Sequence, residues 1–298
     1  MILVTGSTGF VGSHLVRGLA QAGHRVRALA RDPERASGIK GEGVETVIGD
    51  VGDIESLRRA VDGCDAVIHL VGIIQPGPGY TFQSVHVEGT RNVITAAKEA
   101  RVGHFIYQSA LGTREGARSE YHRTKLAAEG LTRASGLNYT ITRPSIIYGE
   151  GDGFTTRMTG IIRRAPIVPV IGRGLGLLQP VYIADLVEAF LRILHNPAYM
   201  GKTLAIVGPE RLSFNEVIAR LEDALGVRRP LVHAPVWAVR PVVAVLERLM
   251  ARPPVTNDQI TMLEEDNAAP MDDMEALGIK PVAFKEGLKL LSLLVKRK

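Results

Sequence analysis

A phenol and an amine stand four residues apart in the segment that carries Tyr121 and Lys125. The pattern around them predicts a helix, and residues at i and i+4 share one helix face, so both groups would enter the same cleft. A nearby ammonium favours the phenolate, lowers the pKa of the phenol and would make Tyr121 a usable acid or base near neutrality. Such a pair is also common on helix surfaces. Its meaning therefore depends on the elements around it.

Three glycines, Gly6, Gly9 and Gly12, lie between an apolar run that begins at Met1 and an amphipathic run that begins at Phe10. This spacing is typical of a strand, a tight turn and a helix N-terminus that bind a dinucleotide. The turn needs a positive φ, the phosphates need bare backbone, and the first helical turn offers free N–H groups to an anion. The cofactor contacts predicted from this loop are Gly6, Ser7, Thr8, Gly9, Phe10, Val11 and Gly12.

The end of the second predicted strand bears on which dinucleotide is bound. It reads Ala30-Arg31-Asp32, where the ribose end of the cofactor should lie. A carboxylate at the strand tip would repel a 2′-phosphate, whereas Arg31, with Arg35 one helical turn later, suits one. NADP(H) is therefore favoured over NAD(H). In the alternative, both arginines are solvated and Asp32 accepts the ribose hydroxyls.

Two further loops are predicted to complete the cofactor site. After the third strand, Asp50 is placed to accept from the adenine amino group, although a turn or N-cap aspartate is an equally good interpretation. The fourth strand ends at Gly72, where bare backbone would let a cofactor ribose approach. The contacts predicted from these two loops are Asp50, Val51, Leu70, Val71 and Gly72.

Short β-branched runs alternate with helical patterns through the first half, which indicates βαβ units. The predicted fold class is α/β, a doubly wound parallel sheet of the Rossmann kind with a smaller C-terminal substrate-binding lobe. Strands are expected near residues 1–5, 25–30, 44–48, 66–71, 104–108 and 138–142. We assign 1–150 to the NAD(P)-binding domain, with 178–207 returning to it, and 151–177 with 208–298 to the lobe.

Composition narrows the functional classes. A chain of 298 residues with 45% apolar content can bury a full core. Its net charge is +5, but the basic residues are scattered and aromatic residues are few, which argues against a nucleic-acid partner. The single cysteine, Cys64, excludes an intramolecular disulfide, and no basic and apolar leader precedes the first strand. We expect a cytoplasmic protein that binds a small-molecule substrate and no metal.

Two apolar segments could make a peripheral contact with the inner face of the membrane or with a redox complex. The run 231–250 is interrupted by His233, Arg240 and Glu247, among others, so it cannot cross a bilayer cheaply. Its default role is core packing, although an exposed part could rest on a membrane or a partner. The tail 289–298 ends in Lys-Arg-Lys and is either an amphipathic anchor or the last helix of the lobe.

Several motifs match the extended branch of one superfamily in order and spacing. They are Thr5-Gly6-Ser7-Thr8-Gly9-Phe10-Val11-Gly12, Gly89-Thr90-Arg91-Asn92, Arg143-Pro144-Ser145-Ile146-Ile147-Tyr148-Gly149 and Val181-Tyr182-Ile183-Ala184-Asp185. With the Tyr121 and Lys125 pair, they resemble the short-chain dehydrogenase/reductase superfamily over almost the whole chain. The resemblance implies that Tyr121 is the acid/base, that Lys125 anchors the nicotinamide ribose, and that Pro144 and Ser145 lie beside the nicotinamide.

A finer resemblance concerns an atypical group that includes the nucleotide-binding accessory subunit of respiratory complex I and bacterial epimerase/dehydratase-like relatives. The segments that look like this group are Ser109-Ala110-Leu111-Gly112, Tyr121-His122-Arg123-Thr124-Lys125, Asp266-Asn267 and Leu277-Gly278-Ile279 followed by Pro281. This likeness implies bound NADP(H) and quinone or membrane redox chemistry more than sugar nucleotides.

Two positions depart from the family pattern. Active members place a serine or threonine where this chain has Ala110, and a methyl group cannot polarise a carbonyl. Ser109, one residue earlier, is the remaining catalytic candidate, although alternation along a strand would turn it to the other face. The usual asparagine is replaced by His86, which we expect to pack or form hydrogen bonds rather than catalyse.

Three functions follow from these residues. The first is an NADP(H)-dependent oxidoreductase that acts on an apolar carbonyl or quinone-like compound, and the intact Tyr121 and Lys125 pair favours it. The second is a cofactor-binding structural or assembly protein of a redox complex, which Ala110 favours. The third, a nucleotide-sugar epimerase or dehydratase, is disfavoured by Ala110, His86 and Arg31.

Overall fold

The computed structural model describes the backbone of residues 1–295 and the side chains of residues 1–291, so the final Lys-Arg-Lys of the predicted tail lies outside the described residues. The chain forms two compact units, Met1–Arg143 with Val187–Leu204, and Pro144–Leu186 with Ala205–Lys298. The division at residue 143 and the return at 187–204 differ from the predicted 150 and 178–207. The reason is that the short strands at 177–178 and 181–182 pair with strands of the second unit.

The first unit is built on a seven-stranded sheet with the order β11-β6-β5-β4-β1-β2-β3, in which neighbouring pairs from β6 to β3 are parallel. This confirms the predicted doubly wound α/β class. The strands are β1 (Ile2–Thr5), β2 (Val26–Ala30), β3 (Val44–Ile48), β4 (Ala66–His69), β5 (His104–Gln108), β6 (Tyr139–Pro144) and β11 (Thr203–Ile206).

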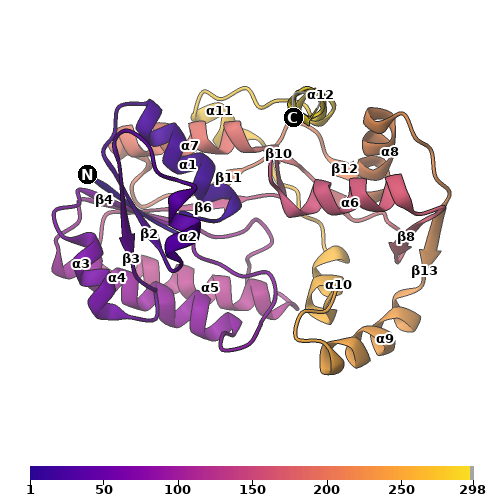
Figure 1. Cartoon of the computed structure of the whole chain (residues 1–298), viewed down its shortest axis with the longest axis horizontal. Helices are drawn as coiled ribbons and strands as arrows, with labels where there is room; N and C mark the ends of the chain where they lie inside the picture. The colour runs from indigo at the N-terminus through magenta and orange to yellow at the C-terminus, as the bar shows by residue number, and fades with distance from the viewer. Residues whose placement is uncertain (296–298) are drawn as a thin grey trace. The chain divides into compact units, whose positions relative to one another are not determined.

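Helices cover both faces of this sheet, with α1 and α7 on one face and α3, α4 and α5 on the other (Figure 1). They are α1 (Phe10–Gln21), α2 (Pro33–Ser37), α3 (Ile54–Val61), the π-helix η1 (Gln83–Glu88), α4 (Gly89–Glu99), α5 (Glu120–Arg133), α7 (Ile183–His195) and the 3₁₀-helix η2 (Pro197–Tyr199). Side-chain caps fix several of the helix starts. Asp53 accepts from Glu55 N–H at α3, and Ser119 accepts from His122 N–H at α5.

One hydrophobic core lies between the sheet and helices α3, α4 and α5. Leu3, Val67 and Phe105 from the strands pack with Leu57 and Val93 from the helices, and all are at most 1% exposed. Parallel strands buried on both faces need this continuous apolar content. The rigid sheet therefore fixes where the loops at its carboxyl edge begin.

The second unit contains three small two-stranded sheets: β7 (Ile147–Tyr148) with β10 (Val181–Tyr182), β9 (Leu177–Leu178) with β12 (Leu212–Ser213), and β8 (Val168–Ile171) with β13 (Leu231–Ala234). Its helices are α6 (Gly153–Arg164), α8 (Phe214–Leu225), α9 (Val236–Leu249), α10 (Asn257–Leu263), α11 (Asp272–Ala276) and α12 (Phe284–Val295). Tyr148, Ile162 and Phe284 are among the side chains of its separate core. Among the described residues, no helix is both long enough and apolar enough to span a bilayer.

Candidate cofactor and catalytic site

The loop after β1 meets the loop after β4 at the point where the strand order reverses, and ligands bind there in open α/β sheets. Gly6 adopts φ +74°, and a Cβ built on it would lie 3.2 Å from the Val71 backbone nitrogen. A Cβ on Gly12 would lie 2.1 Å from the Gly6 carbonyl oxygen, so only glycine lets α1 start this close to the turn. The loop thus has the bare, tightly packed backbone that a pyrophosphate requires.

The N-terminus of α1 is suited to an anion. Gly9 is the N-cap residue and gives no side-chain cap, and the first turn, which Phe10 and Val11 open, contains no acidic residue. The Ser7 hydroxyl points elsewhere and donates to the Leu29 carbonyl over 2.7 Å, which ties the loop to β2, while Thr8 is partly exposed. The residues present therefore fit a dinucleotide phosphate at this helix start.

At the tip of β2, the carboxylate of Asp32 is used locally. It accepts from Glu34 N–H over 2.8 Å and caps α2. This local role differs from the alternative interpretation, in which Asp32 accepts the ribose hydroxyls. Arg31 is 68% exposed, with its Nε 3.7 Å from Asp50 Oδ2, and Arg35 is exposed on α2. Asp50 Oδ1 accepts from Gly52 N–H over 2.7 Å, so Asp50 is a turn aspartate with one oxygen toward Arg31.

The remaining predicted backbone contacts are held in place by hydrogen bonds. The Val51 carbonyl accepts from Asn92 Nδ2 over 2.9 Å, and Leu70 N–H donates to the Thr5 carbonyl. A Cβ on Gly72 would lie 3.2 Å from Lys125 Nζ and 3.6 Å from His86 Nε2. The bare backbone at the end of β4 thus lies directly beside the amine of α5.

The Lys125 side chain is buried, with only 3% of its surface exposed. Its Nζ donates to the Gln108 carbonyl over 2.8 Å and lies 4.9 Å from the centroid of the Tyr107 ring. Desolvation lowers the pKa of this amine to about 7, and Glu129 opposes the shift. The amine therefore titrates near neutrality.

Tyr121 lies among aromatic rings, edge-on to His86 at 5.4 Å, to His122 at 5.2 Å and to Phe82 at 6.0 Å. Desolvation of the phenol by this packing raises the pKa of Tyr121 to about 12. The expected lowering of the phenol pKa by Lys125 is therefore wrong for the protein without ligand, because desolvation dominates. At neutral pH the phenol keeps its proton.

Ser109 is buried. Its hydroxyl donates to Thr113 Oγ1 over 3.3 Å and also forms a hydrogen bond with Glu129, which is wholly buried. Glu129 accepts from Arg143 Nε and Nη2 over 2.8 and 2.6 Å, and from Arg133 over 2.7 Å. Sequence reasoning missed Glu129, although its place four residues after Lys125 was a usable signal.

His86 connects the loop after β4 to α5. Ile73 N–H donates to its Nε2 over 3.0 Å, and its Nδ1 lies 2.9 Å from Thr124 Oγ1. Nε2 also lies 3.1 Å from the Ile73 carbonyl oxygen, so the ring bridges Ile73 and Thr124. Burial lowers the pKa of His86 to about 3, so the ring is neutral. His86 thus forms hydrogen bonds, as expected from the sequence.

Pro144 and Ser145 belong to the second unit and are both buried. Ser145 N–H donates to the Ile206 carbonyl over 3.0 Å, and its hydroxyl donates to Asn267 Oδ1 over 2.5 Å. Asn267 N–H donates in turn to the Leu177 carbonyl. The Asp266-Asn267 motif thus holds Ser145, a link that the motif's place in the sequence does not show.

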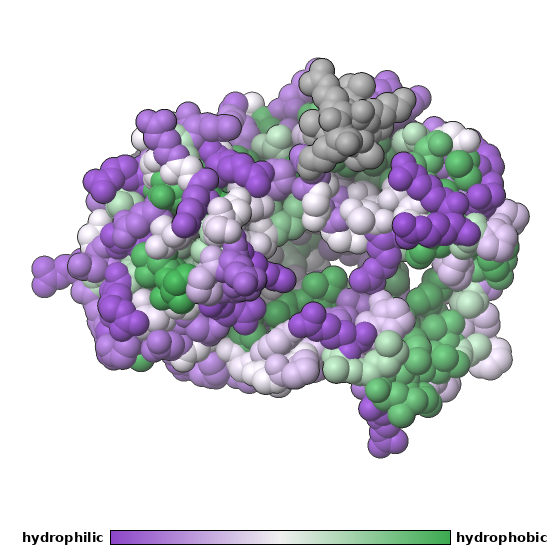
Figure 2. Space-filling view, viewed as in Figure 1, coloured by the Kyte–Doolittle hydropathy of each residue, from purple (hydrophilic) through white to green (hydrophobic). Residues whose placement is uncertain are grey.

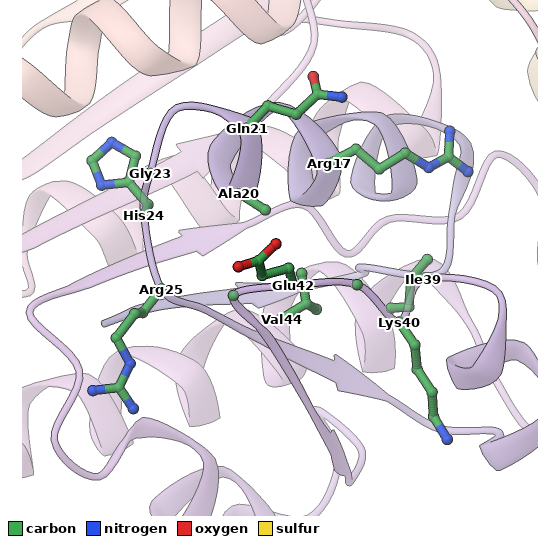
Figure 3. Close-up of a pocket in the computed structure, with 12 residues that line it drawn as sticks. Arg17, Ala20, Gln21, Gly23, His24, Arg25, Ile39, Lys40, Glu42 and Val44 are labelled. Atoms are coloured by element: carbon green, nitrogen blue, oxygen red, sulfur yellow. The ribbon is translucent and has the colours of Figure 1, made fainter.

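A separate pocket of about 490 Å³ lies at the opposite end of the strands (Figure 3). Gly23 and Arg25, which line it, precede β2, and Val44 is the first residue of β3. The Glu42 carboxylate points into it, whereas Arg17 and Lys40 extend away from its centre. Cofactors bind at the carboxyl ends of parallel strands, so this pocket is not the predicted site.

A family model described as NAD(P)H-binding matches residues 6–161, which are more than half of the chain. The chain belongs to this NAD(P)H-binding family. The match begins at Gly6 and includes Gly72, Tyr121 and Lys125, so the glycine loop and the tyrosine–lysine pair both lie within the matched residues.

Relatives and solved structures agree with this assignment. A ceramide reductase from Caulobacter vibrioides is 32% identical over 236 residues, which cover 79% of this chain and 74% of that protein. The mouse (Mus musculus) mitochondrial NADH dehydrogenase [ubiquinone] 1 alpha subcomplex subunit 9 is 29% identical over 294 residues, covering 95% and 77%. MoeE5 in complex with UDP-glucuronic acid and NAD matches with a TM-score of 0.74 and 25% identity, over 97% of this chain and 96% of that one. The resemblance to extended short-chain dehydrogenase/reductases is thereby confirmed.

Proposed function

We propose that this protein is an NADP(H)-dependent oxidoreductase that reduces an apolar carbonyl or quinone-like compound. The proposal is carried by the buried Lys125 amine, held against bare backbone at Gly72 and one helical turn from Tyr121. Burying an amine costs folding free energy, and perturbed titratable groups gather at functional sites. The similarity to a protein named ceramide reductase supports both a reductase and an apolar substrate.

The preference for NADP(H) is supported at the tip of β2. Asp32, the carboxylate that could accept a ribose, already caps α2, while the exposed guanidinium of Arg31 and the exposed Arg35 are available to a 2′-phosphate. Two guanidinium groups bind phosphate oxygens through charge-assisted hydrogen bonds. The pyrophosphate would lie at the start of α1.

The chain's own residues supply the proton chemistry, while a bound nicotinamide would supply the hydride. With a pKa near 12, Tyr121 is protonated at neutral pH and donates its proton from Oη to the substrate oxygen as negative charge develops there. Lys125, at i+4 on the same helix, stabilises the tyrosinate that is left. Ala110 gives no second donor, and the absence of one such hydrogen bond costs about 10²- to 10³-fold in rate. We therefore expect slow turnover.

The test is NADPH oxidation by the purified protein with a panel of long-chain ketones and quinones. Replacing Tyr121 by Phe should lower turnover by about 10²- to 10⁴-fold with little change in NADPH affinity, because only the proton donor is removed. Tyr139→Phe, on β6 and partly buried, is the matched control and should keep full activity. Equal turnover in both variants would remove Tyr121 from the chemistry.

The cofactor preference is tested separately by calorimetric titration with NADPH and NADH. Arg31→Gln should weaken NADPH binding by about tenfold or more, the value of a charge-assisted hydrogen bond, and leave NADH nearly unchanged. Arg17→Gln, also exposed and lining the distant pocket, should change neither. Equal losses of both cofactors in Arg31→Gln would contradict the NADP(H) assignment.

A second candidate is a cofactor-binding structural or assembly protein of a redox complex. It is supported by Ala110, by the Ser109 hydroxyl being engaged with Glu129 and Thr113, and by the similarity to a complex I subunit. This function predicts tight NADPH that no carbonyl oxidises, and a large loss of thermal stability when the cofactor is removed.

A further inference from the structure

Helix α9 in the second unit presents an apolar face to solvent. Trp237 is 79% exposed, Leu249 78%, Val242 59% and Val245 56%, and Val243 is the one buried side chain of this helix. A surface helix normally buries its apolar stripe against the core. In Figure 2 the hydrophobic colour gathers over α9. This arrangement is the reverse of ordinary packing.

The exposed residues form one stripe along the helix. Trp237, Pro241, Val245 and Leu249 follow each other at four-residue spacing, so they lie in a row on one face. Fourteen residues give this row a length of about 21 Å. Met250, directly after the helix and 44% exposed, lengthens it. An exposed apolar row of this kind marks an interaction surface.

Two exposed arginines lie beside this stripe. Arg248 follows Val245 by three residues and therefore shares its face, and Arg252 follows the helix. Both are exposed, and in the described part of the chain neither has a carboxylate within ion-pair distance. The nearby carboxylate of Glu247 accepts from Asn257 N–H and Nδ2, and Arg240 is paired with Glu264 at 3.0 Å. The Glu247 carboxylate keeps its charge and is bound to Asn257, whereas Arg248 and Arg252 have no carboxylate partner among the described residues, so their exposed charges favour an anionic surface.

We propose that α9 docks this protein onto an anionic membrane surface, parallel to its plane. Trp237, Val245 and Leu249 enter the boundary between headgroups and acyl chains, and Arg248 and Arg252 bind lipid phosphates. A second copy of the chain fits this face less well, because a two-fold contact through one stripe would bring the same arginines of both copies together. The docking rests on α9 alone and does not depend on the cofactor or the reaction.

The chain offers its own reporter, because Trp237 is its single tryptophan. The full-length protein is mixed with vesicles of phosphatidylcholine with about one third phosphatidylglycerol, an anionic lipid. We expect the Trp237 emission to move to shorter wavelength, brominated lipids to quench it, and the protein to float with the vesicles. Pure phosphatidylcholine vesicles or high salt should weaken binding by about fivefold or more for the two arginines.

Two variants locate the contact. Leu249→Glu should reduce vesicle binding by at least about tenfold, because one large apolar side chain leaves the interface and a negative charge enters it. Leu290→Glu, on α12 and 42% exposed in the same unit, is the matched control and should bind as the unaltered protein does. Circular dichroism checks that both fold.

Three results would overturn the proposal. One is an unaltered protein that neither floats with anionic vesicles nor shifts its emission. Another is an equal loss of binding in both variants. The third is an emission shift that follows protein concentration without lipid, together with dimers in sedimentation, which would make a second copy the occupant. Measuring NADPH affinity in the same samples keeps a failure of docking separate from a failure of the proposed reaction.

Discussion

Helices α5 and α9 are both fourteen residues long, yet α5 buries charged side chains and α9 exposes apolar ones. On α5 the charged side chains of Lys125 and Glu129 are buried, at 3% and 0% exposure. On α9 the largest apolar side chains, Trp237 and Leu249, are almost fully exposed. Each helix therefore carries a cost that ordinary packing avoids.

The two costs differ in kind. Burying a charge costs folding free energy, which fixed partners must offset. On α5 these partners are the Gln108 carbonyl for Lys125, and Arg143 and Arg133 for Glu129. An exposed apolar stripe costs little in the folding of the isolated chain and needs no internal partner. Changes to the buried charges of α5 should therefore alter stability strongly, and changes in the exposed stripe of α9 should alter association only.

The strongest test of this contrast is Glu129→Gln. The amide leaves the guanidinium groups of Arg143 and Arg133 without their carboxylate, and breaking a buried pair costs about 3 kcal/mol of unfolding free energy. Glu188→Gln, which breaks the exposed pair with Arg192, should cost less than about 1 kcal/mol. Urea denaturation measures both. Similar small values would mean that burial on α5 carries no special cost.

Acid stability sharpens the contrast further, because the neutral His86 ring supports α5, and the neutral His69 ring is buried between Thr5 and Thr90. Burial lowers the folded-state pKa of His69 and His86 to about 3, below their usual 6.5. As the pH falls below about 6.5, the unfolded chain binds protons that the folded chain does not, so stability falls, by up to about 1.4 kcal/mol per pH unit for each ring.

His86→Asn should remove one of these two contributions to the slope. His233→Asn, at an exposed position in the second unit, is the control substitution. The measurement is the thermal midpoint between pH 7 and pH 4.5. An unchanged slope in His86→Asn would show that this ring is already charged in the folded protein.

Much of the first unit could be predicted from the sequence. Alternating apolar runs place each of the six predicted strands within three residues of its observed bounds, and the spacing of Gly6, Gly9 and Gly12 predicts the turn that φ at Gly6 requires. These features are local, since strand period and turn chemistry depend on neighbours in the chain. The pairing of Tyr121 and Lys125 on one helix is local in the same way.

What depended on distant partners could not be predicted. The direction of the Tyr121 pKa shift is set by rings from η1 as well as α5, and the Ser109 hydroxyl is directed by Glu129, twenty residues later. The boundary at 143 follows from short strand pairs in the second unit. Likewise, the apolar run 231–250 was expected to pack in a core by default, because composition alone does not show which face of α9 meets solvent.

The smallest expected effect belongs to Leu249→Gln on α9. Its side chain is 78% exposed, so folding removes little of its surface from water. The unfolding free energy should therefore change by less than about 0.5 kcal/mol. Val243→Gln, six residues earlier and buried, should cost several times more, since it places an amide in an apolar contact. Urea denaturation of both without lipid is the measurement. If Leu249→Gln proved as destabilising as Val243→Gln, the stripe would already be covered in the isolated protein, and α9 would no longer be the opposite of α5.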